Sequence, residues 1–355
     1  MIDLRSDTVT RPTPDMRRVI AAAEVGDDVF HDDPSVLELE ARVADLLGKD
    51  DAIYVASGTM SNQLALRTHT EPGDVVLASE NAHILIHELG APAALSGIHI
   101  HQLPSELGTF TGDAIRAAIP DRTTWAPSIN AGTTTLPDSL FEPIKLVAVE
   151  NTHNAAGGTV WDPAQLADVV RSAKELGLAT HLDGARLWNA AVASGSSEAE
   201  LAAGFDTVSV CFSKGLGAPM GSALVGSAAK IDRARRFKQM FGGGFRQAGM
   251  MAAAALYAVN HQRERLAEDH TNAATFAAGL AEVSGIELDM ATVQSNMIYF
   301  EVTAVPIGEF VRRCAENGVA LFAAGPTSIR VVCNLHVDRA DVDTALAVIE
   351  QAAGA

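Results

Sequence analysis

Short apolar runs alternate with longer stretches of helical spacing between about residues 50 and 230. Such alternation predicts an α/β fold, a mostly parallel sheet with helices on both faces. Seven runs have the length and composition of strands: 52–56, 75–78, 98–103, 146–149, 178–182, 207–212 and 222–225. Residues 163–176 predict an amphipathic helix, because Pro163 stands at its start and Gly177 just past its end. We therefore expect a seven-stranded sheet.

The pattern changes near residue 247. An alanine-rich helical region from 247 to about 283 predicts that the chain leaves the sheet, and Gly285 is a stop signal. Strands are expected near 296–300 and 329–333, with helices near 307–317 and 339–352. We divide the chain into an N-terminal arm (1–20), a large domain (21–250) and a small C-terminal α+β domain (251–355). Residues 124–143 lack periodicity and predict an irregular surface loop.

Composition and charge narrow the class of protein. Of 355 residues 48% are apolar and 20% charged, as in globular proteins. No apolar run reaches the roughly 18 residues of a membrane helix, and the start lacks a signal core, so we expect a cytoplasmic protein. The net charge of −18 disfavours nucleic acid and anionic membranes as partners. Cys211, Cys314 and Cys333 lack ligand-like spacing, which predicts buried thiols and no metal site.

Two predicted strand ends carry reactive side chains. Lys214 follows the run 207–212 in a glycine-rich turn, and Asp183 follows the run 178–182. Such a lysine is often solvated and such an aspartate often caps a helix. A desolvated lysine amine can instead form a Schiff base, and a buried carboxylate requires a cationic partner. Ligands gather at the carboxyl ends of parallel strands. A lysine that forms a Schiff base and an acid that holds a pyridinium nitrogen are the two groups that bind pyridoxal 5'-phosphate (PLP), which we expect as the cofactor.

Other polar residues fit the same hypothesis. The segment 57–62 follows a strand and opens a helix, so its amides could hold a phosphate, although an ordinary serine N-cap explains it equally well. His83 could stack on a cofactor ring and relay a proton. His87, four residues later, would share its helical face and reach a substrate pocket. Arg186 and Arg330 could each bind a substrate carboxylate, with structural ion pairing as the equal alternative.

Seven motifs together resemble the low-specificity L-threonine aldolases, fold-type I PLP enzymes of the β-eliminating lyase group. They are DLRSDTVT (3–10), GDDVFHDDP (26–34), SGTMSN (57–62), ENTHN (150–154), HLDGAR (181–186), SKGLG (213–217) and GGGFRQ (242–247). The similarity runs from residue 2 to about 335 in the same order. It implies retro-aldol cleavage of threonine, allo-threonine and related β-hydroxy-α-amino acids to glycine and an aldehyde.

The resemblance also implies a role for each matching residue. Lys214 would be the Schiff-base lysine, Asp183 the partner of the pyridine nitrogen, and His83 the stacking ring and first candidate for the base. The phosphate cradle would be Gly58 and Thr59.

The remaining roles concern the substrate and a second subunit. By the same resemblance Ser6, Arg186 and Arg330 would bind the substrate carboxylate. Arg246 would reach the cofactor phosphate of a neighbouring subunit in a homotetramer, a dimer of dimers with shared sites. A solvated arm is the ordinary alternative for the polar residues Arg5, Ser6 and Asp7.

The chain departs from the family pattern on the side of the aldehyde. Ala155 and Ala156 replace a usual Gly-Lys, and a frequent loop histidine has no counterpart, with Leu140 near its place. Gln239 replaces a lysine, and His87 stands where an aromatic residue is expected. β-Elimination, or an aldolase for a bulkier side chain, therefore stays open. A protein that only stores PLP is a further alternative, but storage needs no carboxylate-binding arginines.

Overall fold

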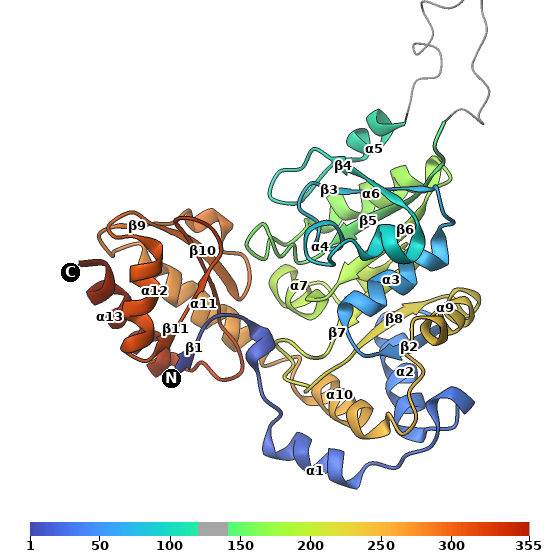
Figure 1. Cartoon of the computed structure of the whole chain (residues 1–355), viewed down its shortest axis with the longest axis horizontal. Helices are drawn as coiled ribbons and strands as arrows, with labels where there is room; N and C mark the ends of the chain where they lie inside the picture. The colour runs from blue at the N-terminus through green and yellow to red at the C-terminus, as the bar shows by residue number, and fades with distance from the viewer. Residues whose placement is uncertain (120–140, 355) are drawn as a thin grey trace, which may run out of the picture.

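The computed structural model describes residues 1–119 and 141–354, so most of the predicted loop 124–143 lies outside the described residues. Its centre is a seven-stranded sheet of order β2-β8-β7-β6-β5-β3-β4, as Figure 1 shows. The strands are β2 (Asp51–Val55), β3 (Val75–Ser79), β4 (His99–Leu103), β5 (Ile144–Glu150), β6 (Ala179–Gly184), β7 (Thr207–Cys211) and β8 (Ser222–Gly226). All seven predicted strands are confirmed. Within this sheet β8 runs opposite to the other six strands, so that it is antiparallel to both β2 and β7.

Helices cover both faces of this sheet. Successive strand residues point to opposite faces, so Tyr54 joins one apolar core and Ile53 another. The helices of the large unit are α1 (Pro14–Ala22), α2 (Pro34–Leu46), α3 (Gly58–His69), α4 (His83–Ile86), α5 (Gly112–Ala118), α6 (Pro163–Glu175), α7 (Leu187–Ser194), α8 (Glu198–Ala202), α9 (Ala228–Met240) and α10 (Gly249–His261). The predicted helix α6 begins where Asp162 caps it and ends before Gly177, whose φ is 70°.

The C-terminal part forms a second, smaller α+β unit. Its antiparallel sheet has the order β12-β13-β10-β9, and its helices pack around Phe276, Phe300 and Phe310. The elements are α11 (Leu266–Leu280), β9 (Ile286–Glu287), β10 (Met297–Val302), α12 (Ile307–Glu316), β11 (Val319–Ala320), β12 (Phe322–Ala323), β13 (Ser328–Val332) and α13 (Arg339–Gly354). The first residues of the chain join this unit, because β1 (Ile2–Asp3) pairs with β11 (Figure 1).

The alanine-rich region 247–283 is two helices. Helix α10 packs on α1 and α2 in the core of the large sheet, whereas α11 belongs to the core of the smaller unit. Each of these two helices buries its apolar face in a different core. A high alanine content predicts a helix but does not show where one helix ends and the next begins. The domain boundaries near residues 20 and 250 stay a prediction. The three cysteines are buried free thiols, and no helix in the described ranges is long and apolar enough to cross a membrane.

Candidate active site

Lys214 stands in the connection between β7 and β8, beyond the end of β7. The turn is fixed by its backbone, because the Thr10 hydroxyl donates to the Lys214 carbonyl at 2.9 Å and the Gly217 amide donates to it at 2.8 Å. Gly217 has a φ of 77°, and a Cβ there would lie 2.7 Å from Leu335. The sequence signal of a glycine-rich turn therefore corresponds to a tightly packed site for the lysine.

The Lys214 side chain lines a cavity of about 680 Å³ between the large sheet and the smaller unit. The cavity brings together six residues singled out from the sequence: Ser6, His83, His87, Arg186, Lys214 and Arg330. The other lining residues are Thr8, Asn81, Ile86, Asn154, Ala155, Tyr299, Phe322 and Ala324. An amine, two guanidinium groups and two imidazoles thus line one open cavity.

Asp183 lies at the end of β6, buried behind His83. One carboxylate oxygen accepts from Asn62 Nδ2 at 2.6 Å, and the other accepts from the Ala185 amide at 3.1 Å. Burial alone would raise the pKa of Asp183, but the positive charges of His83 and Lys214 hold it below its usual value. Asp183 is therefore an ionised acid next to the lysine, as the two strand ends predicted.

His83 and His87 come from the short helix α4 and its end, with ring centroids 5.3 Å apart. Burial alone would lower the pKa of His83, but the hydrogen bond from its Nδ1 to Glu88, 2.9 Å long, and the charge of Asp183 raise it. In contrast, burial and the neighbouring His83 lower the pKa of His87. The pKa values of these two adjacent imidazoles are therefore shifted in opposite directions, that of His83 toward the cation and that of His87 toward the neutral base.

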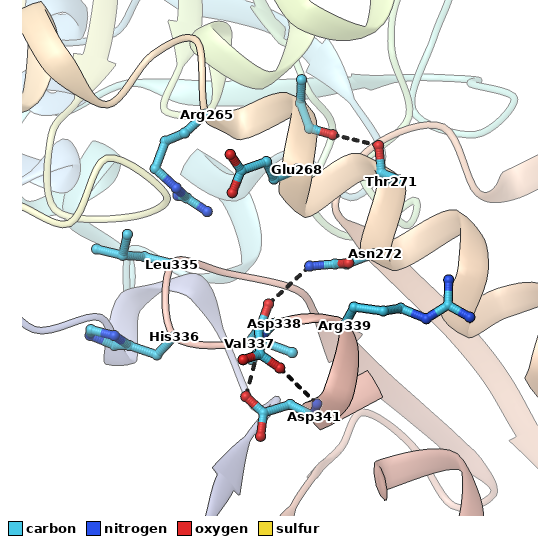
Figure 2. Close-up of a pocket in the computed structure, with 11 residues that line it drawn as sticks. Arg265, Glu268, Thr271, Asn272, Leu335, His336, Val337, Asp338, Arg339 and Asp341 are labelled. Carbon is cyan, nitrogen blue, oxygen red and sulfur yellow. Dashed lines mark hydrogen bonds between the residues drawn. The ribbon is translucent and has the colours of Figure 1, made fainter. Parts of the chain in front are cut away.

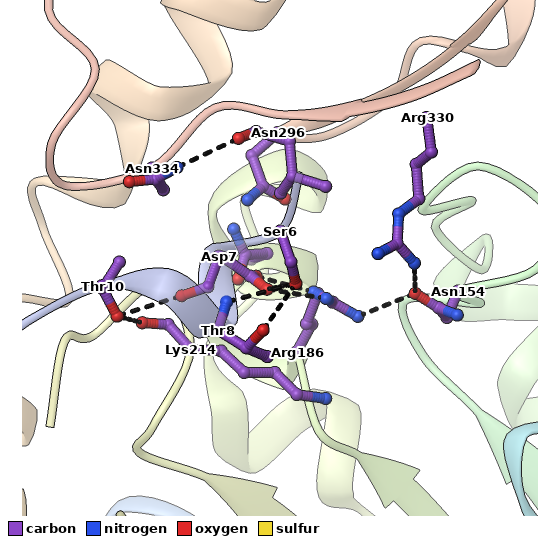
Figure 3. Close-up of polar contacts among 12 residues, drawn as sticks. Ser6, Asp7, Thr8, Thr10, Asn154, Arg186, Lys214, Asn296, Arg330 and Asn334 are labelled. Atoms are coloured by element: carbon purple, nitrogen blue, oxygen red, sulfur yellow. Dashed lines mark hydrogen bonds and ion pairs between the residues drawn. The ribbon is translucent and has the colours of Figure 1, made fainter. Parts of the chain in front are cut away.

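Arg186 is held by the N-terminal arm. Its Nε and Nη2 each donate to Asp7 at 2.7 Å, and its Nη1 donates to Asn154 at 3.2 Å, so that it lies between the two (Figure 3). The structure thus confirms the ion-pairing alternative for Arg186, although its side chain also lines the cavity. Asp7 is fully buried, and the expectation of a solvated arm is wrong for this residue.

Arg330 extends from β13 with unused hydrogen-bonding capacity. Its Nη1 donates to the same Asn154 oxygen at 3.4 Å (Figure 3). Its Nη2 donates to the Arg5 carbonyl at 3.1 Å. The guanidinium packs 4.8 Å from the ring centroid of Phe322. Its buried Nε has no acceptor among the described residues. An anionic group in the cavity would satisfy this donor.

Gly58 and Thr59 open helix α3, next to the sheet edge but outside the lining of the cavity. Ser57 caps the helix by accepting from the Met60 amide at 3.2 Å, which confirms the ordinary N-cap interpretation. A Cβ at Gly58 would lie 2.7 Å from the sulfur of Cys211. The Gly58 and Thr59 amides donate to no acceptor within the described part of the chain. Two free amides at a helix N-terminus suit a phosphate.

Arg246 does not line the cavity of its own chain. Its side chain is 64% exposed and pairs with Asp27 at 3.1 Å. The structure therefore places Arg246 on the surface, in an ion pair within its own chain.

A second cavity, of about 760 Å³, lies between α11 and the loop before α13 (Figure 2). Its lining mixes both signs of charge, with Arg265 and Arg339 near Glu268 and Asp338. It contains none of the residues predicted from the sequence. The smaller cavity is the candidate active site, because only it combines the lysine with histidines beside a buried acid.

Three residues of the site were not singled out from the sequence. Glu88 accepts from Asn62 Nδ2 at 2.8 Å, so that Asn62 joins the carboxylates of Glu88 and Asp183. Asn154 bridges the two guanidinium groups. Asn62 and Asn154 are the last residues of two of the seven family motifs, and this position was the signal in the sequence that could have identified them. Glu88 had none.

The profile of the beta-eliminating lyase family matches residues 3–303. This chain belongs to that family. Among beta-eliminating lyases and their relatives, it is 37% identical over 356 residues to low-specificity L-threonine aldolase 1 of Arabidopsis thaliana, covering 99% of this chain and 96% of the relative. It is 39% identical over 344 residues to the low specificity L-threonine aldolase of Escherichia coli K12, covering 96% and 95%. The solved structure of Leishmania major threonine aldolase has the same fold, with a TM-score of 0.83, 21% identity and 99% of both chains covered.

Proposed function

We propose that this chain is a PLP-dependent aldolase that cleaves L-threonine, L-allo-threonine and related β-hydroxy-α-amino acids to glycine and an aldehyde. The observation that carries the proposal is the convergence of Lys214, His83 and Arg330 on one cavity in front of buried Asp183. Curated relatives of nearly the same length, 37% and 39% identical to this chain, are named threonine aldolases.

The donor set fits the cofactor. Asp183, ionised and buried, would hold the pyridine nitrogen, and Lys214 would bind the aldehyde carbon. The free amides of Gly58 and Thr59 would receive the phosphate. His83, held by Glu88, would lie against the ring face. When bound, PLP supplies the electron sink for the carbanion that remains after the Cα–Cβ bond breaks.

The substrate carboxylate would bind at Arg330 and Ser6, beside Arg186. Among the described residues the Nε of Arg330 has no acceptor, whereas the Nε and Nη2 of Arg186 are already used by Asp7. Arg330 therefore supplies the free donors, and Arg186 contributes a fixed positive charge nearby.

We assign the proton of the substrate hydroxyl to His87. The resemblance favoured His83 as the base, but a base must be neutral to accept a proton, and the pKa of His83 is raised by Glu88. The pKa of His87 is lowered, and its ring lines the same cavity. His87 thereby takes the place of the loop histidine that the sequence lacks, while His83 orients the ring.

We also propose a cytoplasmic homotetramer with active sites shared between subunits. Arg246 is exposed and is not among the residues that line the cavity of its own chain, as expected of a residue used by a neighbour. The N-terminal arm supports the same cavity through Ser6 and Asp7.

Product analysis with purified protein tests the function. Threonine should yield glycine and acetaldehyde in equal amounts after loading with PLP. Pyruvate and ammonia from serine would favour the alternative, β-elimination. Turnover only with β-hydroxy amino acids of larger side chain would favour a bulkier aldol substrate, which the unusual His87 leaves open. Cofactor binding without turnover would indicate storage.

A further inference from the structure

A continuous series of hydrogen bonds, buried near Asp183 and partly buried at its outer end, runs from Asp183 toward the surface. We name it the Asp183 relay, and its members are Asp183, Asn62, His181, Thr207, His69 and Lys230. The spacing of residues along α3 and the register of β6 and β7 bring these side chains together. Asn62 and His69 are two turns apart on α3, while His181 and Thr207 are register partners on β6 and β7. One face of α3, the strands β6 and β7, and Lys230 of α9 thus build the series.

At Asp183, the inner end of the Asp183 relay, the neighbouring groups determine which atom donates and which accepts in each hydrogen bond. Asn62 Nδ2 lies 2.6 Å from Asp183 and 2.8 Å from Glu88, and both neighbours are acceptor carboxylates. The amide nitrogen must therefore face them, which leaves the Asn62 oxygen toward His181 Nε2 at 3.1 Å. Since this oxygen only accepts, His181 must carry a proton on Nε2.

The direction continues through the sheet. His181 is fully buried, and burial lowers its pKa to about 4, so its ring is neutral. Its Nδ1 then accepts from the Thr207 hydroxyl, 2.9 Å away. A hydroxyl has one proton, so the Thr207 oxygen accepts from His69 Nε2 at 3.0 Å.

At Lys230, the outer end of the Asp183 relay, the neighbouring groups require the same direction of hydrogen bonding. His69 Nδ1 faces the half-buried amine of Lys230 at 3.3 Å, and an ammonium group only donates. Burial and the charge of Lys230 lower the pKa of His69 to about 3, so this ring is neutral too. Both ends independently require the same orientation of every proton.

We propose that the Asp183 relay is a positioning device in which every donor points inward, from Lys230 to the carboxylate that would hold the cofactor. Each link strengthens the next, because a group that accepts a hydrogen bond becomes a better donor. Asn62 therefore presents a polarised amide to Asp183, which keeps the carboxylate ionised and fixes its plane. Its role in cofactor binding rests on the proposed function; its direction does not.

Thr207→Val cuts the Asp183 relay in the middle without changing the volume much. Thr68→Val is the matched control, because Thr68 is also buried and its hydroxyl has no partner among the described residues. The first measurement is histidine-selective ¹⁵N NMR on apoprotein at pH 7. We expect His181 and His69 to be neutral with the proton on Nε2 and with Nδ1 accepting. In Thr207→Val, the Nδ1 of His181 should shift to the resonance of a nitrogen that accepts no hydrogen bond.

The second measurement is the Kd of apoprotein for PLP. Thr207→Val should weaken it by about fivefold, the order for one hydrogen bond, while Thr68→Val should match wild type. A His181 ring that is cationic, or protonated on Nδ1, overturns the direction of the relay, even if Thr207→Val fails to fold. Equal affinity in wild type and Thr207→Val overturns its role at the cofactor. Wild type that binds no PLP at all overturns the proposed function instead, whatever the NMR gives.

Discussion

Asp7 and Arg186 are 179 residues apart in the sequence and form two parallel hydrogen bonds of 2.7 Å in the interior. The pair joins the N-terminal arm to the end of β6, close to Asp183. Arg186 also reaches Asn154, whose oxygen is shared with Arg330. The arm is therefore part of the frame that orients the positive groups of the cavity.

Asp7→Asn should destabilise the fold by about 3–5 kcal/mol, because it leaves the buried Arg186 charge without its partner. The free energy of unfolding in urea at pH 7 measures this loss. Asp3→Asn is the matched control in the same arm, since the Asp3–Arg5 pair is exposed and should change little. Equal stability of the two variants would contradict a structural role for Asp7.

The same pair predicts how stability changes in acid. Burial alone would raise the pKa of Asp7, but Arg186 holds it below the usual 3.8. A carboxyl whose folded pKa is depressed contributes fully above its unfolded pKa and loses that contribution as the pH falls through the folded value. Wild type should therefore lose stability below about pH 4 more steeply than Asp7→Asn. Parallel acid profiles would count against the pair.

Arg330→Ala should weaken glycine binding by roughly 2–5 kcal/mol, because it removes the free donors of the proposed carboxylate site. Spectroscopic titration of the PLP-loaded protein with glycine gives the affinity. Arg339→Ala, which changes an arginine of the second cavity, should bind glycine like wild type. If both variants bind glycine normally, Arg330 lies outside the substrate site.

His87→Phe should lower kcat for threonine by about a hundredfold or more, the usual contribution of a general base. Wild-type kcat should also fall in acid as His87 becomes protonated, at a pH below its ordinary pKa of 6.5, and this limb should vanish in the variant. His99→Phe, on exposed β4, is the control. An unchanged kcat in His87→Phe would return the role of base to His83.

Glu88→Gln should lower the pKa of His83, because the carboxylate that stabilises the imidazolium becomes neutral. An NMR pH titration of the His83 ring in apoprotein measures the change without cofactor. Glu80→Gln alters an exposed neighbour and should leave the titration as in wild type. A midpoint that stays fixed in Glu88→Gln would show that Glu88 does not control the charge of His83.

The sheet and the core of the site were predictable because they depend on local signals. Runs such as 207–212 carry no charged residue and are mostly apolar, as is typical of strands buried on both faces, and each reactive residue follows such a run. The sequence alone therefore places Lys214 and Asp183 at one edge of the sheet.

The rest depends on contacts between distant segments. Nothing near Asp7 in the sequence indicates that Arg186 will enclose it. Nothing in the sequence distinguishes Glu88 from the other acidic residues; its role follows from the fold, which places it after α4 within hydrogen-bonding distance of Asn62. The division between α10 and α11 follows from which core each helix meets, and a single helical pattern does not encode that choice.

The visible absorbance of purified, PLP-loaded protein tests the central claim most directly. Lys214→Ala should lose the band that a lysine Schiff base with the cofactor gives, because no other lysine lines the described cavity. Lys49→Met is the control: burial lowers the pKa of this amine, but it lies outside the cavity and donates to the Phe205 carbonyl. We predict that the band is lost in Lys214→Ala and kept in Lys49→Met; an unchanged band in Lys214→Ala would contradict the account.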